Sequence, residues 1–253
     1  MERRVSCEVC NSSIGGTLVS VFPNIIMKVP ANASMQEKST IYESAVNSPR
    51  EMSLLEFLKL GEKYREVIER LRSCEDKEIR NKIKRTELPC ATISASFTSR
   101  ASSKAVEEKL KRYNSLMVLD FDNLEDPAAA KEELSQLPFF WYIGLSVGGK
   151  GLFGIVPLGT DDFKEHKVYF NALRKELEVF GYEVDKACCD VTRLRVVSYD
   201  PDAFFNENCE VFCIDEREED DGEVYSSGPV PERAQDRSSR IELYVLEWEK
   251  RHV

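Results

Sequence analysis

The apolar positions between residues 51 and 86 recur with the three-to-four-residue spacing of amphipathic helices. One predicted helix begins near Ser53, and a second follows a break at Gly61. A third short helix is predicted through "DKEIRNKIKR", ending before Leu88 and Pro89. The first fifty residues alternate short apolar runs, "TLVSVF" and "NIIMKV", with Ser, Asn and Pro, which predicts a short hairpin and loops.

The pattern changes after residue 86, where predicted strands and helices alternate. The first predicted elements are a strand at "CATISASF" and a basic helix from Ser102 to about Tyr113. A strand at 116–121 and a helix from about Pro127 to Gln136 follow. The last predicted elements are strands in "FFWYIGLSV" and "GLFGIVPL", a helix from about Asp162 to Phe180 and a strand near "RLRVVSY".

From residue 116 this order is β-α-β-β-α-β, the split βαβ arrangement of RRM and ferredoxin-like α+β folds. In that fold the helices cover one face of the sheet and the other face stays open. The first strand lies in the centre, flanked by the third and fourth strands. We therefore expect an α+β core with an open functional face.

Composition shifts divide the chain into five expected segments. They are a hairpin and loop segment (1–50), a helical subdomain (51–85), the α+β core (86–214), an acidic linker (215–237) and a C-terminal helix (238–253). The linker includes "DEREEDDGE", with seven acids and one Arg. The helix after it stops abruptly, so we expect the chain to be part of a longer protein.

The net charge of −10 argues against indiscriminate binding to nucleic acid, although residues 71–115 carry eleven Lys or Arg against six acids. No apolar run is long enough to span a membrane and no signal core begins the chain, so we expect a cytoplasmic protein without a membrane partner. The eight cysteines are expected to be free thiols. Cys7 and Cys10 have the spacing of a zinc site but lack a nearby second pair of ligands.

The segment "LMVLDFDNLEDP" places two carboxylates on an apolar strand. Alternate strand residues share a face, so Asp120 and Asp122 stand side by side. Two neighbouring like charges raise each other's pKa unless a cation lies between them. A solvated turn at the strand end is the ordinary explanation of such a pair, and a divalent-metal site for Mg²⁺ or Mn²⁺ is the functional one.

Two further groups of residues give weight to the metal site. The hairpin "LSVGGKGLFG" brings Ser146, Gly148 and Lys150 to a turn whose amides and ammonium can contact phosphate. Near the last strand, a third acid and two basic residues are expected to reach the acid pair. The third acid is either Asp185 or Asp190, and the basic residues are Arg193 and Arg195, which share a face.

This succession of motifs resembles the archaeo-eukaryotic primase superfamily of primase-polymerases. More narrowly, "LPCATISASF", "LMVLDFDN", "LSVGGKGLFGIVP" and "GYEVDKACCDVTRLRVVSYDPDAFFN" look like the primase-like N-terminal domain of VirE-type proteins from bacterial mobile elements. The resemblance covers roughly residues 50–206, so segment 86–214 would be a primase-polymerase core.

The resemblance implies a role in DNA replication, as a DNA primase or polymerase that transfers nucleotides to a 3′-hydroxyl on a DNA template. Its partners would be nucleoside triphosphates, single-stranded DNA or primer-template, and a helicase domain or subunit. The roles it implies divide into two sets. The catalytic and metal-binding residues would be Asp120, Asp122 and Asp185, with Asp190 as the competing metal ligand, and the nucleotide-binding residues would be Ser146, Gly148, Lys150, Arg193 and Arg195.

One departure from the superfamily leaves alternatives open. The superfamily has a nucleotide-binding histidine in the motif that corresponds to the hairpin, and this chain has Phe153 there. The nearest histidine, His166, is predicted to be an ordinary surface or edge residue of the following helix. One alternative is a catalytically degenerate primase-fold module that binds nucleic acid or nucleotide. The other is a haloacid-dehalogenase-like phosphatase, which also carries Asp-x-Asp on its first strand but needs parallel βαβ units.

Overall fold

The computed structural model describes residues 18–22, 50–99, 104–214 and 237–252 of the chain. These ranges contain seven α-helices and ten short strands, and the paired strands of each sheet run antiparallel. The protein is therefore a mixed α+β protein, as the hydrophobic pattern predicts. Antiparallel pairing does not fit the parallel units that the phosphatase alternative needs.

The main sheet has the strand order β10-β7-β8-β6. Its strands are β6 (Leu116–Phe121), β7 (Tyr142–Leu145), β8 (Leu152–Pro157) and β10 (Phe204–Phe205). The hairpin of β7 and β8 confirms the prediction from the glycine-rich turn, and β8 also pairs with the whole of β6. β6 therefore lies at an edge of the main sheet, and the prediction that it is central is wrong.

A second sheet of four strands has the order β2-β1-β3-β9. Its strands are β1 (Leu18–Phe22), β2 (Arg50–Ser53), β3 (Cys90–Thr92) and β9 (Leu194–Val196). The fourth strand of the expected pattern is β9, and it pairs with β3 instead of β6. The free edge of β6 instead accepts a backbone hydrogen bond of 2.9 Å, from the amide of Asp185 to the carbonyl of Asp120.

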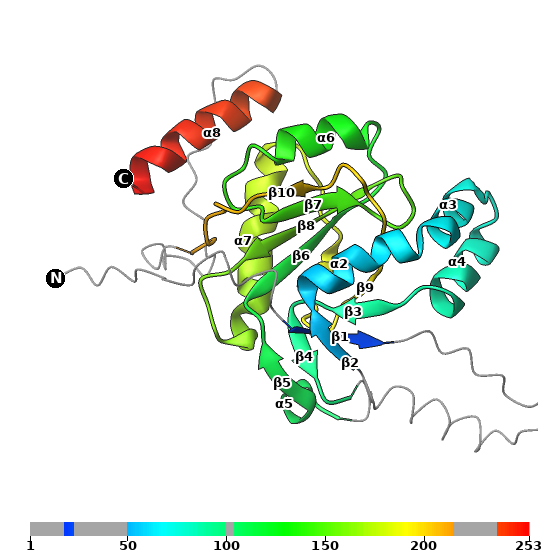
Figure 1. Ribbon diagram of the computed structural model, residues 1–253. Coiled ribbons are helices and arrows are strands. Elements are labelled where there is room, and N and C mark those ends of the chain that lie inside the picture. Colours follow the sequence, from blue (N-terminus) through cyan, green and yellow to red (C-terminus); the bar gives the residue numbers. More distant parts are fainter. Residues whose placement is uncertain (1–17, 23–49, 100–103, 215–236, 253) are drawn as a thin grey trace, which may run out of the picture.

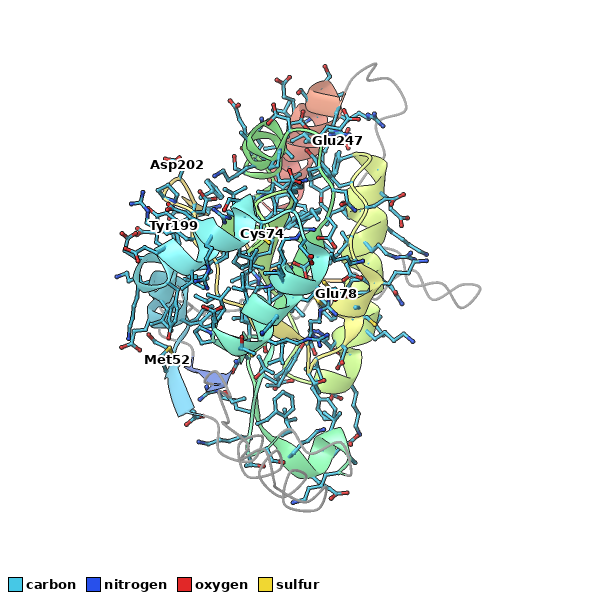
Figure 2. All side chains as sticks on the ribbon, turned by 90° about the vertical axis from the view of Figure 1, so that its right-hand side faces the viewer. Met52, Cys74, Glu78, Tyr199, Asp202 and Glu247 are labelled. Carbon is cyan, nitrogen blue, oxygen red and sulfur yellow. The ribbon has the colours of Figure 1, made fainter. Side chains whose placement is uncertain are left out.

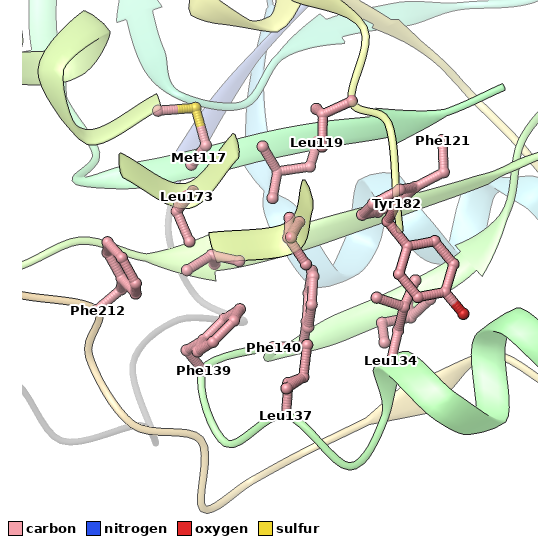
Figure 3. Packing of buried hydrophobic residues seen from close by; sticks show 14 of the residues in the cluster. Met117, Leu119, Phe121, Leu134, Leu137, Phe139, Phe140, Leu173, Tyr182 and Phe212 are labelled. Atoms are coloured by element: carbon pink, nitrogen blue, oxygen red, sulfur yellow. The ribbon is translucent and has the colours of Figure 1, made fainter. Parts of the chain in front are cut away.

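One face of the main sheet packs against helices from the C-terminal half of the chain. They are α6 (Pro127–Leu134), α7 (His166–Val179) and α8 (Arg237–His252). Figure 3 shows Met117, Leu119 and Phe121 of β6 in this cluster, together with Leu173 of α7 and Leu134 of α6. The odd-numbered residues of β6 thus form the larger core.

The opposite face of the main sheet is also covered, so the expected open face is wrong. Leu116 and Val118 of β6 pack in a second cluster with residues of α2 (Leu54–Lys63), α3 (Arg65–Ser73) and α4 (Lys77–Thr86). Figure 1 shows these three helices and the β1 to β3 strands grouped away from α7. The N-terminal region buries apolar side chains that an open face would leave in water.

The three N-terminal helices are present, with one boundary displaced from its expected place. α2 begins with a capping box between Ser53 and Glu56 and ends at Lys63, so it runs through Gly61 without a break. Gly61 is a point of close packing, because a Cβ there would collide with the carbonyl of Ser198. The glycine therefore marks an approach between helix and loop.

Two predictions between residues 90 and 113 need correction. The expected single strand "CATISASF" is divided into β3 and β4 (Ala95–Phe97), which belong to different sheets. The expected basic helix is only the short α5 (Val106–Lys109), and β5 (Leu110–Tyr113) follows it and pairs with β4. Tertiary pairing with β4 overrides the helical character of this polar segment.

The remaining predictions concern the chain ends and the linker. The strand in "TLVSVF" is present as β1, whereas "NIIMKV", Cys7, Cys10 and linker residues 215–236 lie outside the described residues. The predicted C-terminal helix is present as α8 and contributes Ile241 and Tyr244 to the larger core. Among the described residues, no helix combines the length and apolar character needed to cross a membrane.

Candidate metal and phosphate site

Two of the predicted acids meet between the sheets, beside a cysteine. Asp120 is the fifth residue of β6 and is buried, and Asp185 is the N-cap of the short 3₁₀ turn η3 (Lys186–Cys189). Their carboxylate oxygens and the sulfur of Cys188 all lie within 4.8 Å of one another. This group can hold a metal ion.

Two arginines neutralise the acids. The Nη2 atom of Arg195 donates to Oδ1 of Asp120, and the Nη2 atom of Arg193 lies 2.7 Å from Oδ2 of Asp185 and 3.9 Å from Oδ2 of Asp120. The expected positive charge beside the acids is therefore supplied by guanidinium groups. Burial lowers the pKa of Arg195 to about 10, which leaves it charged at neutral pH.

Phe153 lies at the centre of this arrangement. It is the residue of β8 directly opposite Asp120, its side chain is 1% exposed, and the guanidinium carbon of Arg195 lies 4.7 Å from the centre of its ring. A cation above an aromatic face is attracted by the ring electrons. The ring therefore supports the arginine that pairs with Asp120.

The other two predicted acids lie outside the group. Asp122 follows the end of β6 and is exposed, next to Asn123, whose φ of 55° turns the chain away from the strand direction. Asp190 is exposed, and its carboxylate accepts hydrogen bonds from the amide and hydroxyl of Thr192. Of the two candidates for the third acid, only Asp185 reaches Asp120.

The predicted phosphate loop lies beside the end of β6, and among the described residues it forms no hydrogen bond or ion pair with Asp120 or Asp185. The turn is closed by a hydrogen bond from the amide of Ser146 to the carbonyl of Gly151, and the carbonyl of Lys150 accepts from the amide of Leu124. The Lys150 side chain is exposed, and a Cβ on Gly148 would meet open space. The loop therefore presents an ammonium group and a bare backbone near Asp122.

Arg72 of α3, for which no sequence motif predicts a role, fixes this loop. Its guanidinium donates to the carbonyls of Ser146 at 3.1 Å and Tyr199 at 2.7 Å, and to the hydroxyl of Ser198 at 3.3 Å. Burial lowers its pKa, and the charge of Asp200 opposes that change. The helical region and the chain after β9 are thereby tied to the same turn, which no local sequence signal indicates.

The donor set fits a hard divalent cation. Carboxylate oxygens are the ligands that Mg²⁺ and Mn²⁺ prefer, whereas a thiol is a soft ligand. Burial raises the pKa of Cys188 to about 12, so this thiol is protonated at neutral pH and lies 3.6 Å from Oδ2 of Asp120 as a weak hydrogen-bond donor. Asp120 and Asp185 are therefore the two protein ligands that the site offers.

His166 is a further correction, because it is buried and not a surface residue. Its side chain is 1% exposed at the start of α7, with Nδ1 2.9 Å from the hydroxyl of Tyr113 and no hydrogen-bond partner at Nε2 among the described residues. Burial lowers its pKa to about 4, partly opposed by the charge of Asp190. His166 thus packs behind the turn that carries Asp185.

Comparison with known proteins gives one match. The family model described as BT4734-like, N-terminal domain, matches residues 83–205, which are 123 of the 253 residues. The matched range begins in α4 and ends in β10, so it includes both acids, both arginines and the hairpin loop. No curated protein and no solved structure matches the chain. The chain is therefore similar to this N-terminal domain over slightly less than half of its length.

Proposed function

We propose that the protein is a primase-polymerase-type nucleotidyltransferase of a mobile-element replication protein. The observation that carries the proposal is the meeting of Asp120 and Asp185 with Arg193 and Arg195 between the two sheets. Acids that hold a divalent cation, beside arginines that bind phosphate, are the groups that nucleotidyl transfer needs. The resemblance of the sequence to primase-like N-terminal domains supports the same assignment.

Each charged residue has a distinct task in this proposal. Asp120 and Asp185 would hold Mg²⁺ or Mn²⁺, and the bound ion would supply Lewis acidity for the attacking 3′-hydroxyl and positive charge for the triphosphate. Without a metal ion, Arg193, whose side chain is 40% exposed, pairs with both carboxylates. Once a metal ion neutralises the carboxylates, this arginine can pair with a phosphate instead. Arg195, 9% exposed, stays with Asp120 and keeps that carboxylate in position.

The hairpin loop gives the proposal a second phosphate contact. Lys150 is exposed next to the end of β6, and Arg72 fixes the turn from behind through the carbonyls of Ser146 and Val147. Because the turn is already fixed, only the side chain of Lys150 has to be ordered when it binds an anion. We assign Ser146, Gly148 and Lys150 to the triphosphate, with a helicase domain or subunit as the partner that supplies single-stranded template.

A second candidate function is a catalytically degenerate module that binds nucleic acid. Two observations favour it over the enzyme. Phe153 occupies the position where the superfamily has a histidine and is packed beneath Arg195, and Asp122 lies outside the acid group. Such a module would bind nucleic acid or nucleotide while another protein carries out the chemistry.

The test is Mn²⁺-dependent extension of a labelled primer-template by the wild type, Asp185→Asn and Asp190→Asn. Both substitutions remove one negative charge in the same short segment, and asparagine keeps the cap of η3 or the contact with Thr192. We expect Asp185→Asn to abolish extension and Asp190→Asn to retain it.

Nucleotide binding measured with the same three proteins separates the two candidate functions. Mn²⁺-dependent binding of a nucleoside triphosphate without extension would favour the degenerate module. If the well-folded wild type shows neither binding nor extension, the enzyme is rejected. Equal activity of the two variants would remove Asp185 from the site.

A further inference from the structure

Helix α4 carries a row of cations that the proposed function does not use. Lys77, Arg80 and Lys84 are spaced three and four residues apart, which places them on one face of the helix. Lys82 and Arg85 lie on other faces and are exposed, whereas Arg80 and Lys84 are half-buried. The row is about 10 Å long, at 1.5 Å per residue.

The inner end of this row lies close to the acid site. Ile83, which lies between Arg80 and Lys84 on the helix, is buried in the same cluster as Phe153 and Ala91. Both of these residues contact Arg195, Phe153 through its ring and Ala91 as its strand partner. Burial and the charges of Arg80 and Arg195 lower the pKa of Lys84, and the charge of Asp122 opposes this. Figure 2 shows α4 on the face turned to the viewer, where Glu78 is labelled.

In the part of the chain that the structure describes, no acid lies within ion-pair distance of the cations of the row. Among the described residues, none of Lys77, Arg80 and Lys84 forms an ion pair, although acids elsewhere in the protein pair readily, such as Glu87 with Arg70. The dipole of α4 favours cations in its last turn and accounts for Lys84 and Arg85. It does not account for Arg80, which lies near the middle of the helix and acts on Lys84 as a like charge.

We propose that the face of α4 formed by Lys77, Arg80 and Lys84 binds the phosphate backbone of a single-stranded nucleic acid and leads it to the acid site. A row of this length extends beyond a compact triphosphate, whereas successive backbone phosphates follow such a row. The protein as a whole carries a net charge of −10, so most of its surface repels a polyanion. The three cations of this face attract one locally. The inference rests on the proposed function, because it names the strand that the same site would act upon.

The test compares two double variants of α4 in binding to a fluorescent single-stranded DNA oligonucleotide. Arg80→Gln with Lys84→Gln removes two charges from the row, and Lys82→Gln with Arg85→Gln removes two charges from other faces of the same helix. Fluorescence anisotropy is measured at several salt concentrations, and the thermal unfolding of both variants checks that the helix is intact.

We expect the Arg80 and Lys84 variant to bind about tenfold more weakly, and its plot of log affinity against log salt to become shallower by about 1.4, because each lost single-strand phosphate contact removes about 0.7. The Lys82 and Arg85 variant should stay within about twofold of the wild type, as expected for charges that do not touch phosphate. Equal weakening in both variants, or no binding by the wild type at low salt, would overturn the proposal.

Nucleotide binding separates this inference from the proposed function. Mn²⁺-dependent binding of a nucleoside triphosphate is measured on the same proteins without DNA. The proposed function fails if the wild type does not bind the nucleotide. The strand-binding face still stands in that case if the Arg80 and Lys84 variant loses DNA affinity and the Lys82 and Arg85 variant keeps it. If nucleotide binding is normal and DNA binding is absent, only the strand-binding face fails.

Discussion

Arg195 of β9 donates a hydrogen bond to the carboxylate of Asp120 on β6, and the two side chains are each 9% exposed. The pair joins the two four-stranded sheets, because β6 belongs to one and β9 to the other. A buried ion pair is costly to desolvate, and removing one partner leaves an uncompensated charge in the interior. This pair therefore links the charge of the candidate site to the stability of the whole fold.

Replacing Arg195 tests this link. Arg195→Met leaves the buried Asp120 carboxylate with only the 3.9 Å ion-pair contact to Arg193, so we expect the free energy of unfolding to fall by about 3 kcal/mol. Arg193→Met removes the neighbouring, 40% exposed arginine and should cost less than about 1 kcal/mol. Urea unfolding followed by circular dichroism measures both.

A double variant separates charge from packing in the same experiment. Arg195→Met with Asp120→Leu removes both charges and should recover most of the stability lost in Arg195→Met alone. If the double variant is as unstable as the single one, the loss comes from packing against Phe153 and the ion-pair explanation is wrong.

The role assigned to Cys188 gives a second prediction. If Asp120 and Asp185 are the ligands and the thiol is only a neighbour, Cys188→Ala should bind Mn²⁺ within about threefold of the wild type, because a soft thiol adds little to a hard cation. Asp185→Asn should weaken binding at least tenfold. Isothermal titration calorimetry measures both, and a tenfold loss in Cys188→Ala would make the cysteine a ligand.

The buried His166 predicts a specific pH dependence of stability. Burial holds its pKa near 4 in the folded state, below the ordinary value of 6.5 in the unfolded chain. Between these values the unfolded chain binds more protons, so stability falls as the pH drops from about 6.5 and the loss from this group is complete below about pH 4. The full contribution is about 3 kcal/mol.

His166→Gln isolates this contribution, since glutamine can still bond to the Tyr113 hydroxyl but does not titrate. We expect the wild type to lose about 2 kcal/mol more than the variant between pH 7 and pH 4.5, measured by urea unfolding at each pH. Parallel losses in the two proteins would show that His166 is accessible to protons in the folded state.

Adjacent glycines in the hairpin loop provide a matched pair of variants. Gly149 has a φ of +72°, and a Cβ there would lie 3.1 Å from the side chain of Arg72, whereas a Cβ on Gly148 would meet nothing within 4 Å. We expect Gly149→Ala to lower the free energy of unfolding by about 1 to 2 kcal/mol and Gly148→Ala by less than about 0.5 kcal/mol. Thermal unfolding of both variants checks this, and equal losses would contradict the clamp by Arg72.

Local sequence patterns were sufficient for elements whose partners are near in the chain. The apolar run of β6, the start of α6 at Pro127 and the hairpin of β7 and β8 are all present where predicted. The hydrogen bonds of α6 form within the helix and those of the hairpin form across one short turn. The strand character of β6 follows from its own run of apolar residues, although its partner β8 lies further along the chain. Predictions failed where the partner is distant, as for β9, which pairs with β3 some hundred residues earlier.

The candidate site shows the same division. The sequence indicated that Asp120 needed a positive neighbour and that Arg193 and Arg195 share a face, because like charges and strand alternation are local properties. It left Asp185 and Asp190 as alternatives, and gave no sign that Arg72 or Cys188 would lie nearby. Those placements depend on how loops and helices pack across the chain.

The sequence by itself determined the mixed α+β class, the acidic strand and the glycine-rich hairpin, since periodicity and turn chemistry are written in neighbouring residues. Only the tertiary structure decided that β6 is an edge strand, that its second face is buried and that Asp185 reaches Asp120. The physical reason is that side chains far apart in the chain compete for the same buried surface, and the best packing of all of them selects the arrangement.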